Sequence, residues 1–412
     1  MGLRRRKHIA ILHYAAPPVV GGVETTLAHH ARLLAADGYR VRVVCGRGQA
    51  WDSSIEVRRV RLADSRSPEA EVARASLEAG RVPRNFDGLA TRLEARLGPL
   101  LHESGLVIAH NIASLHKNLV LTAALHRLWQ RHALPRLILW HHDFAWTSPQ
   151  HRSRMHDGYP WDLLRLDWGG CTHVVVSSSR RDDLLSLMSV PDERLRVIPP
   201  GIDADEVLGL SPEARDFMMR ARLRDASPLL LLPARITPRK NLELALHILH
   251  DIRKQMPTAR LLITGPPGPH SSANRAYADE LRRLRHGLGL EEAAVFAFEI
   301  HPEGLPARVL FDIYRVADGL LLTSHEEGFG IPVLEAGIHG LPVFLSDIPP
   351  LRAVAGEEGV FFGIDEDSHI IARRIADRLQ GDPRHRLRAR VAQEYTWEGV
   401  YRRCIRPLVE LQ

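Results

Sequence analysis

The sequence predicts an α/β protein made of two domains, each built on a doubly wound parallel sheet. The chain has 412 residues, which is more than one hydrophobic core usually supports, so two domains of roughly 200 residues each are expected. Short apolar runs alternate with helical periodicity through both halves, as in parallel sheets covered on both faces. Hydrophobic residues make up 45% and charged residues 25% of the chain, which is typical of a folded globular protein.

The first half opens with one β-loop-α-β unit. A strand at His8 to His13 leads through a Gly/Pro loop into a helix at about Glu24 to Asp37, and a second strand follows at Arg40 to Cys45. A polar, poorly periodic stretch, about Arg66 to Arg84, predicts an exposed helix or a mobile segment. Later apolar runs alternate with helices such as Asn118 to Arg131 and predict strands at Leu106 to Ala109, Leu137 to Trp140 and His173 to Val176.

The second half restarts the same alternation. Helices are expected at Leu242 to Gln255 and Ala276 to Leu288, between strands at Leu229 to Leu232, Arg260 to Thr264, Ala294 to Phe298 and Gly319 to Thr323. Consecutive prolines and a glycine interrupt the periodicity between Val197 and Asp203. The expected domains are therefore residues 1–198 and 199–385.

Composition narrows the class of protein. The net charge is +6 and the pI is near 9.5, but basic residues are spread along the chain, so no nucleic acid partner is expected. The three cysteines lie far apart without a C-x-x-C pair, so neither a disulfide framework nor a zinc site is indicated. The apolar stretch after the basic N-terminus is short and broken by prolines, and no apolar run is long enough to span a bilayer. A cytoplasmic location with at most peripheral membrane contact is expected, and the sequence leaves a homodimer open.

The segment from Leu320 to Gly337 is the most informative in the chain. An apolar strand ends at Thr323-Ser324, and a glycine-containing loop leads into a helix near Ile331-Pro332, since proline suits the first helical turn. Backbone amides of Phe329, Gly330 and Ile331 are then expected at the carboxyl edge of the sheet, where ligands of open α/β sheets bind. Glu327 and Glu335 can reach different hydroxyls of one polar ligand. Alternatively, Glu327 caps the helix and Glu335 lies on a solvated face.

A second strand-loop-helix unit carries Arg235 and Lys240. Arginine can hold phosphate oxygens bidentately and lysine places a point charge, so a diphosphate fits this loop. Only four of the 55 basic residues are lysines, which makes a lysine in this loop notable. The alternative is an ordinary basic loop.

Other candidates lie in the first half. Gly21 and Gly22 follow the first strand but do not form a G-x-G-x-x-G fingerprint, which argues against a dehydrogenase; a plain tight turn is the alternative. His142, beside His141 and Asp143, follows a strand and is expected at the same sheet edge. Further candidates for ligand contacts follow the preceding strand: His110, Asn111, His116, Lys117 and Asn118.

The segment from Thr323 to Gly337 resembles the E-x7-E signature of glycosyltransferase family 4, and Arg235 and Lys240 resemble the phosphate-binding pair of that family. The resemblance implies the GT-B fold, two Rossmann-like domains facing across a cleft, with a C-terminal helix, residues 386–412, crossing back to the first domain. Pro233-Ala234 departs from the usual Gly-Arg lead into the phosphate loop. Asp203-Ala-Asp205 matches a D-x-D metal motif only superficially, because Pro-Pro-Gly-Ile-Asp203 resembles the interdomain turn of the family, and the acidic run from Asp365 to Asp367 is expected to be a solvated loop.

The resemblance implies a retaining hexosyltransferase that uses a nucleotide diphosphate sugar, with GDP-mannose and UDP-glucose the leading donors. It assigns Arg235 and Lys240 to the leaving diphosphate, Glu335 to the ribose, Glu327 to sugar hydroxyls and His142 to the sugar, while the Gly21-Gly22 loop borders the acceptor and the donor phosphates. No cofactor and no fixed metal site are expected, although a divalent metal could stimulate. The acceptor is expected to be small and polar, a saccharide or lipid-linked, and His110, Asn111, His116, Lys117 and Asn118 are the candidates on the acceptor side. The stretch from Met155 to Arg165 faintly resembles mannosylglucosylglycerate synthases.

Three alternatives are open. A nucleotide-sugar epimerase has the same fold, and a non-catalytic sensor could keep the donor site. A glycoside hydrolase using the two glutamates needs carboxylates facing each other across one bond, for which the sequence supplies no partner.

Overall fold

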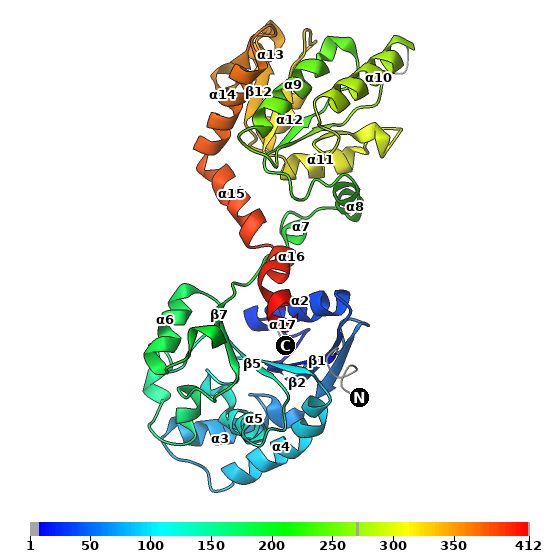
Figure 1. Ribbon diagram of the computed structural model, residues 1–412. Coiled ribbons are helices and arrows are strands. Elements are labelled where there is room, and N and C mark those ends of the chain that lie inside the picture. The colour runs from blue at the N-terminus through cyan, green and yellow to red at the C-terminus, as the bar shows by residue number, and fades with distance from the viewer. Residues whose placement is uncertain (1–7, 269–271, 411–412) are drawn as a thin grey trace. The chain divides into compact units, whose positions relative to one another are not determined.

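The computed structural model describes residues 8–268 and 272–410, which form two compact units (Figure 1). Within the described residues, unit 1 runs to Gly201 and resumes at Trp397, and unit 2 is Ile202–Thr396. The return segment therefore begins later than residue 386. Residues 386–396 belong to unit 2, because Arg388 donates hydrogen bonds to the carbonyls of Ala317 (3.0 Å) and Arg315 (2.6 Å).

Unit 1 contains a seven-stranded parallel sheet in the order β3-β2-β1-β4-β5-β6-β7. The strands are β1 (His8–Ala15), β2 (Arg40–Arg47), β3 (Ile55–Arg59), β4 (Leu106–His110), β5 (Leu137–His141), β6 (Thr172–Val175) and β7 (Leu195–Val197). The strand order reverses between β1 and β4, which are hydrogen-bonded neighbours. A crevice at the carboxyl ends of two such strands is the usual ligand site of an open α/β sheet.

Helices cover both faces of this sheet (Figure 1). One face packs against α2 (Gly22–Ala36) and the C-terminal segment, which consists of α16 (Trp397–Val400), a π-helical turn (Tyr401–Ile405) and α17 (Arg406–Glu410). The other face packs against α3 (Pro68–Glu78), α4 (Phe86–His102) and α5 (Leu119–Gln130). Helix α6 (Ser178–Leu187) forms a smaller core with β6 and β7.

Unit 2 contains a six-stranded parallel sheet in the order β10-β9-β8-β11-β12-β13. The strands are β8 (Leu229–Leu232), β9 (Arg260–Ile263), β10 (Ala294–Phe296), β11 (Gly319–Leu322), β12 (Val343–Ser346) and β13 (Val360–Phe362). Here the order reverses between β8 and β11, which are also paired. These are the two strands that precede the Arg235–Lys240 loop and the Glu327 loop.

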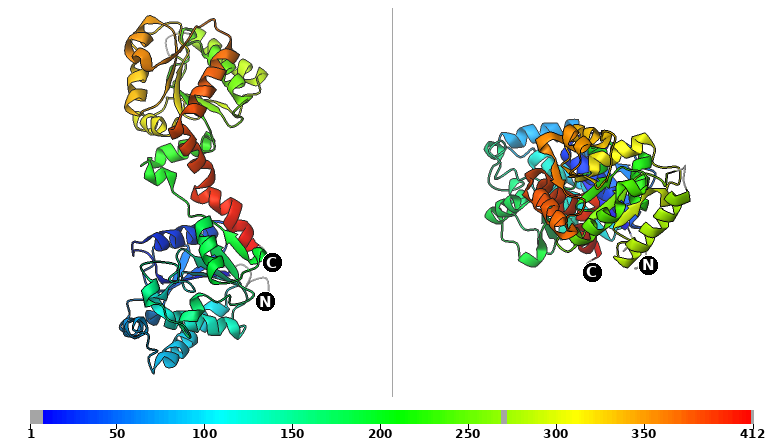
Figure 2. Two further views of the ribbon diagram at one scale, coloured as in Figure 1. Left: turned by 90° about the vertical axis from the view of Figure 1, so that its left-hand side faces the viewer. Right: turned by 90° about the horizontal axis from the view of Figure 1, so that it is seen from above.

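The two faces of this sheet are again covered by helices (Figure 2). One core joins the sheet to α9 (Leu242–Arg253), α10 (Ser272–Gly287) and α14 (Ser368–Gly381), and the other joins it to α8 (Pro212–Arg220), α11 (Ala307–Val316), α12 (Ile331–Ile338) and α13 (Pro349–Ala355). The turn α7 (Ala204–Val207) and helix α15 (Pro383–Glu394) complete the unit.

Most predicted elements are present with ends shifted by one or two residues. The strand expected at Ala294 to Phe298 stops at Phe296, and a 3-10 turn follows at Ala297–Glu299. The Arg66 to Arg84 stretch contains α3, a helix whose Ala70, Ala73 and Leu77 are buried. Strands β3, β7, β12 and β13 were not predicted, nor were helices α4, α6, α8, α11, α13 and α14.

Helix α4 is nevertheless encoded by its sequence. Leu89, Leu93, Leu97 and Leu101 recur every four residues and are all buried, which is the apolar stripe of an amphipathic helix. None of the helices in the described ranges combines the length and apolarity that crossing a bilayer requires.

Candidate functional site

In unit 2, hydrogen bonds join the loop after β8 to the loop after β11. The Thr323 hydroxyl lies 2.8 Å from the carbonyl of Asn241 and 3.0 Å from that of Lys240. The amide of His325 donates to the carbonyl of Arg239 at 2.9 Å. Because neighbouring parallel strands end at the same sheet edge, these contacts bring the two motifs predicted from the sequence into one site.

At the centre of this site, the Lys240 ammonium pairs with Oε1 of Glu327. The same oxygen accepts a hydrogen bond from the Ser324 hydroxyl at 2.7 Å. The two charged side chains are only 11% and 10% exposed, so water screens their attraction weakly. Oε2 of Glu327 makes no hydrogen bond within the described part of the chain, which leaves it available to a ligand hydroxyl.

Arg235 lies on the same loop and is exposed, without a hydrogen bond or ion pair to any described residue. Its backbone passes very close to Gly265, where an added Cβ would lie 2.4 Å from the carbonyl oxygen of Ala234. A side chain at this position would push the loop outward. Gly265 therefore permits the loop conformation that presents the Arg235 guanidinium to solvent.

Helix α12 starts at Gly330, which adopts a φ of 103°, a conformation that favours glycine. An added Cβ would also lie 2.8 Å from Leu351. The flanking Phe329 and Ile331 are 57% and 60% exposed. The start of α12 is thus flanked by exposed side chains and follows the loop that carries Glu327.

Glu335 lies one turn into α12 and is held by a residue that was not predicted. The buried hydroxyl of Tyr314 on α11 donates to Oε2 of Glu335 at 2.6 Å. Burial and this hydrogen bond raise the pKa of Tyr314, so the phenol keeps its proton. The His339 ring stacks on Tyr314 with centroids 5.3 Å apart. Glu335 is therefore fixed in one orientation and is not a free surface carboxylate.

In unit 1, His142 follows β5 at the carboxyl edge of the sheet. Its backbone amide donates to Oδ1 of Asn111 at 2.7 Å, and its Nε2 lies 3.1 Å from Nδ1 of His110. Asn111 has a φ of 56°, a left-handed conformation that asparagine tolerates. His110 and Asn111 are buried, so they position His142 and are not exposed acceptor contacts.

Three histidines at or beside this edge, His142, His30 and His110, are neutral at physiological pH. Burial, supported by the charge of His13, lowers the pKa of His142 to about 4. Burial lowers the pKa of His30 to about 3 and that of His110 well below its usual value. Neither nitrogen of His30 has a hydrogen-bond partner within the described chain, and its ring packs 4.5 Å from that of Trp140.

Glu24, on the first turn of α2, lies beside this edge. Its carboxylate is 3.7 Å from Nε2 of His13, whose Nδ1 donates to the carbonyl of His110 at 2.9 Å. Burial opposes ionisation of Glu24, but the nearby His13 ring, the backbone amide of Glu24 and the charge of Lys117 outweigh it and lower its pKa. Gly21 and Gly22 lead into this turn, and a Cβ at Gly22 would meet no atom within 4 Å.

The remaining acceptor candidates are used differently. Asn118 caps α5 by accepting the amide of Leu121 at 3.1 Å, and its own amide donates to the carbonyl of Leu62 at 3.0 Å. Its polar atoms are therefore committed to the fold. His116 is buried, whereas Lys117 is exposed.

The acidic segments 203–205 and 365–367 lie at the N-terminal ends of helices. Asp203 accepts the amide of Glu206 at 2.9 Å and caps α7, and Asp205 pairs with Arg224. Asp367 caps α14 by accepting the amide of His369 at 2.8 Å. The run from Asp365 to Asp367 is thus the turn that leads into α14 and supplies its N-terminal cap.

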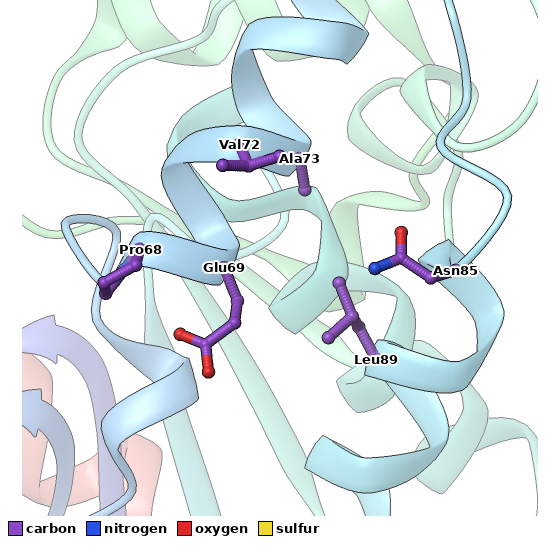
Figure 3. Close-up of a pocket in the computed structure, with 6 residues that line it drawn as sticks. All are labelled: Pro68, Glu69, Val72, Ala73, Asn85 and Leu89. Carbon is purple, nitrogen blue, oxygen red and sulfur yellow. The ribbon is translucent and has the colours of Figure 1, made fainter.

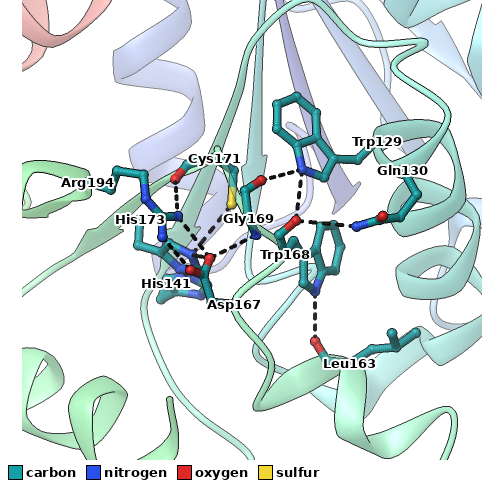
Figure 4. A network of polar contacts seen from close by, with 10 residues as sticks. All are labelled: Trp129, Gln130, His141, Leu163, Asp167, Trp168, Gly169, Cys171, His173 and Arg194. Atoms are coloured by element: carbon teal, nitrogen blue, oxygen red, sulfur yellow. Dashed lines mark hydrogen bonds and ion pairs between the residues drawn. The ribbon is translucent and has the colours of Figure 1, made fainter. Parts of the chain in front are cut away.

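A buried polar network in unit 1 brings Asp167, Cys171 and His173 together, with ligand atoms within 4.8 Å of one another (Figure 4). The Oδ1 atom of Asp167 already accepts three hydrogen bonds, from Gly169 (3.0 Å), Arg194 (2.9 Å) and His173 (3.2 Å). Since its lone pairs are taken, this carboxylate is a poor metal ligand. The network instead links β6 to β5 through His173 Nδ1, which lies 3.0 Å from Nε2 of His141.

A pocket of about 270 Å³ lies between α3 and α4 (Figure 3). Its lining offers one carboxylate, Glu69, and one amide, Asn85, and Val72 is 71% exposed. Ligand sites usually combine apolar walls with several convergent polar groups, so this pocket is not the candidate site.

Several residues that contact or adjoin the predicted ones within each unit were not themselves predicted: Ser324, Tyr314 and Asn241 in unit 2, and His13, Glu24 and His30 in unit 1. Ser324 and Asn241 stand beside predicted residues, so their position at a strand end or helix start was a usable signal. Tyr314 lies on another element, and no local pattern connects it to Glu335.

Two family models match the chain. One, described as Glycosyltransferase Family 4, matches residues 20–206, and the other, described as Glycosyl transferases group 1, matches residues 215–394. Among solved structures, sucrose-phosphate synthase of Thermosynechococcus elongatus has 18% sequence identity and a TM-score of 0.40, with 97% of this chain and 98% of that chain covered.

Curated relatives match over shorter lengths. A D-inositol 3-phosphate glycosyltransferase of Xylanimonas cellulosilytica is 30% identical over 189 residues, covering 44% of this chain and 42% of the relative. A GDP-mannose-dependent alpha-(1-6)-phosphatidylinositol monomannoside mannosyltransferase of Mycolicibacterium smegmatis is 31% identical over 199 residues, covering 47% and 49%. The chain spans about half the length of these relatives. Because the two family models together cover all but a few residues between 20 and 394, the chain belongs to glycosyltransferase family 4 and has the two parallel-sheet α/β units of the GT-B fold.

Proposed function

We propose that this protein transfers a hexose, mannose or glucose, from a nucleotide diphosphate sugar to an acceptor hydroxyl with retention of configuration. The observation that carries the proposal is the joined loop pair of unit 2. It places the Lys240–Glu327 pair, the exposed Arg235 and the open start of α12 at one sheet edge. Cationic groups for a diphosphate and carboxylates for hydroxyls are the groups that such a donor requires.

The difficult event is departure of the diphosphate from the anomeric carbon. Negative charge develops on the leaving phosphate, so a cation that is already in place lowers the barrier without reorganising. Arg235 and Lys240 supply that charge. Lys240 pairs with Glu327. Phosphate oxygens of the donor compete for the same ammonium, and Glu327 then turns to the sugar hydroxyls.

Glu335 and His142 complete the proposed roles. Glu335, oriented by Tyr314, accepts hydrogen bonds from the donor ribose. His142 orients the sugar, and because its pKa is about 4 it acts as a neutral hydrogen-bonding group at pH 7. As acceptors we propose polyols and their phosphates, including inositol phosphates and phosphatidylinositol glycosides, in line with the names of the curated relatives.

A nucleotide-sugar screen tests the proposal. Melting temperatures are measured with GDP-mannose, UDP-glucose and their free nucleotides, and transfer is then assayed with an acceptor mixture. One nucleotide sugar is expected to raise the melting temperature and to yield free nucleotide and a glycosylated product. An epimerised sugar would instead identify an epimerase, and unchanged donor would identify a sensor. If no nucleotide sugar stabilises the chain, the proposal fails.

Tyr314→Phe tests how Glu335 is oriented. Removing the hydroxyl frees the carboxylate to rotate, so we expect the donor KM to rise about tenfold with little change in kcat, which is the signature of lost ground-state binding. Steady-state kinetics with varied donor measures both constants.

The matched control is Tyr401→Phe. Tyr401 also donates to a carboxylate, Oδ2 of Asp37 at 2.8 Å, but in unit 1 and on the C-terminal segment. It is expected to cost similar stability and to leave the donor KM unchanged. Equal effects of the two variants on KM would show that Tyr314 has only a structural role.

A further inference from the structure

Three basic side chains in unit 1 converge on a single carboxylate. Arg74 on α3, Arg154 in the loop after β5 and His116 in the loop after β4 lie 3.8, 3.7 and 3.4 Å from Oε1 of Glu78. They come from three separate segments of the chain. Two guanidinium groups against one carboxylate leave this cluster with net positive charge.

The cluster has unused hydrogen-bond donors. At 3.4–3.8 Å the contacts with Glu78 are longer than most hydrogen bonds, and the guanidinium groups of Arg74 and Arg154 make no hydrogen bond to any other described residue. His116 is 94% buried, since its exposed fraction is 6%, and its Nε2 faces the Glu78 carboxylate. In a neutral imidazole this nitrogen then carries the proton, and phosphate oxygens that displace Glu78 would accept its hydrogen bond.

The cluster also lies near the proposed acceptor side. The loop that begins at His110, the neighbour of His142, ends at His116 and Lys117. Lys117 is close enough to Glu24 for its charge to lower the pKa of that carboxyl. Burial, together with the charges of His151, Arg154 and Arg74, lowers the pKa of His116 to about 4 against the opposing effect of Glu78. His116 is therefore neutral at pH 7 and offers a hydrogen bond, while Arg74 and Arg154 supply the positive charge.

We propose that Arg74, Arg154 and His116 form an anion subsite that binds a phosphate group carried by the acceptor. This inference rests on the proposed function and names a class of acceptor, a phosphorylated polyol. Phosphate oxygens accept bidentate hydrogen bonds from guanidinium groups, and they compete with Glu78 for the cluster. Glu78 acts as the internal counterion when no acceptor is bound.

Phosphate binding tests the subsite directly. The full chain is titrated with inorganic phosphate by calorimetry in saturating nucleoside diphosphate, so that the donor site is occupied. We expect Arg74→Gln/Arg154→Gln to weaken phosphate binding at least tenfold. The matched control, Arg81→Gln/Arg84→Gln, removes the same charge from exposed positions nearby and is expected to change phosphate binding less than twofold. Glu78→Gln removes the competing carboxylate and is expected to tighten binding several-fold.

Glu78→Gln separates a binding site from a structural ion-pair network. If the network only holds the fold together, this variant lowers the melting temperature and does not tighten phosphate binding, which overturns the proposal. Phosphate affinity that is equal in wild type and Arg74→Gln/Arg154→Gln overturns it as well.

Transfer assays identify the source of the phosphate. Inositol is compared with inositol 3-phosphate, and vesicles of phosphatidylcholine with vesicles that also contain phosphatidylinositol. A phosphorylated soluble acceptor should be preferred at least tenfold in kcat/KM, or the anionic vesicles at least tenfold in binding. Arg74→Gln/Arg154→Gln should lose that preference, and Arg81→Gln/Arg84→Gln should keep it. If Arg74→Gln/Arg154→Gln lost transfer to inositol and to inositol 3-phosphate equally, the subsite would be contradicted. If the chain bound no nucleotide sugar, the proposed function would fail, and the phosphate titration would still test the subsite by itself.

Discussion

Lys240→Ala is expected to lower kcat/KM by about a thousandfold, the largest effect on activity at any single position of the site. A cation placed against developing charge in a poorly hydrated site contributes about 10²–10³-fold to the rate. Lys240 is only 11% exposed, so water screens its charge weakly. Steady-state kinetics with the best nucleotide sugar measures the loss.

The same variant leaves Glu327 partly buried without its cation, which is destabilising in its own right. Lys240→Ala/Glu327→Gln removes the uncompensated charge and is expected to regain melting temperature without regaining activity. Recovery of both properties together would mean that Lys240 supports the fold and not the reaction.

Lys254→Ala is the matched control. Lys254 also pairs with a carboxylate, Asp251 at 2.6 Å, at the C-terminal end of α9. The Lys240 loop lies at the N-terminal end of the same helix. Activity of Lys254→Ala is expected within twofold of wild type, and a thousandfold loss there would contradict the specific role of Lys240.

Unit 1 is expected to lose several kcal/mol of stability between pH 7 and pH 5. Burial holds the pKa of His30 at about 3 and the pKa values of His116 and His142 at about 4, and it keeps those of His110 and His141 well below the usual value. In the unfolded chain these groups protonate near pH 6.5. The unfolded state therefore binds more protons between about pH 4 and 6.5, so the free energy of unfolding falls as the pH is lowered through this window.

Tryptophan fluorescence follows this transition selectively. All seven tryptophans lie in unit 1, including Trp397 in the returning segment. Urea unfolding followed by fluorescence at pH 7.5, 6 and 5 therefore reports on this unit. An unfolding free energy that is constant over these pH values would contradict the burial of neutral histidines.

His30→Phe isolates one contributor. The ring of His30 packs on Trp140 and has no hydrogen-bond partner within the described residues, so phenylalanine keeps the aromatic contact and removes the proton site. We expect a gain of about 2 kcal/mol at pH 5 relative to wild type and a shallower pH dependence by about one proton. His132→Asn, at an exposed position of the same unit, should leave the slope unchanged.

Local sequence determined the fold class, most elements and the family. Apolar runs of four to eight residues encode buried parallel strands because both faces of such a strand are covered, and β8 begins and ends where this pattern predicts. The Glu327–Glu335 and Arg235–Lys240 motifs were visible because a strand end, a glycine or proline turn and a helix start are local signals. The elements that were not predicted carry weaker signals, such as the edge strand β3, whose residues are mostly half-buried or exposed.

Only the tertiary structure decided which side chains face each other. The pairing of β8 with β11 brings Lys240 to Glu327 across 87 positions of the chain, and packing of α11 against the sheet brings Tyr314 to Glu335. The convergence of Arg74, His116 and Arg154 on Glu78 likewise joins helix α3 to the loops after β4 and β5. Such contacts depend on strand order and helix packing, which local periodicity does not encode. The sequence by itself therefore determined the fold class and the motifs in unit 2. The tertiary structure decided which side chains pair with the motif residues and hold them in place, as Glu327 does for Lys240 and Tyr314 does for Glu335.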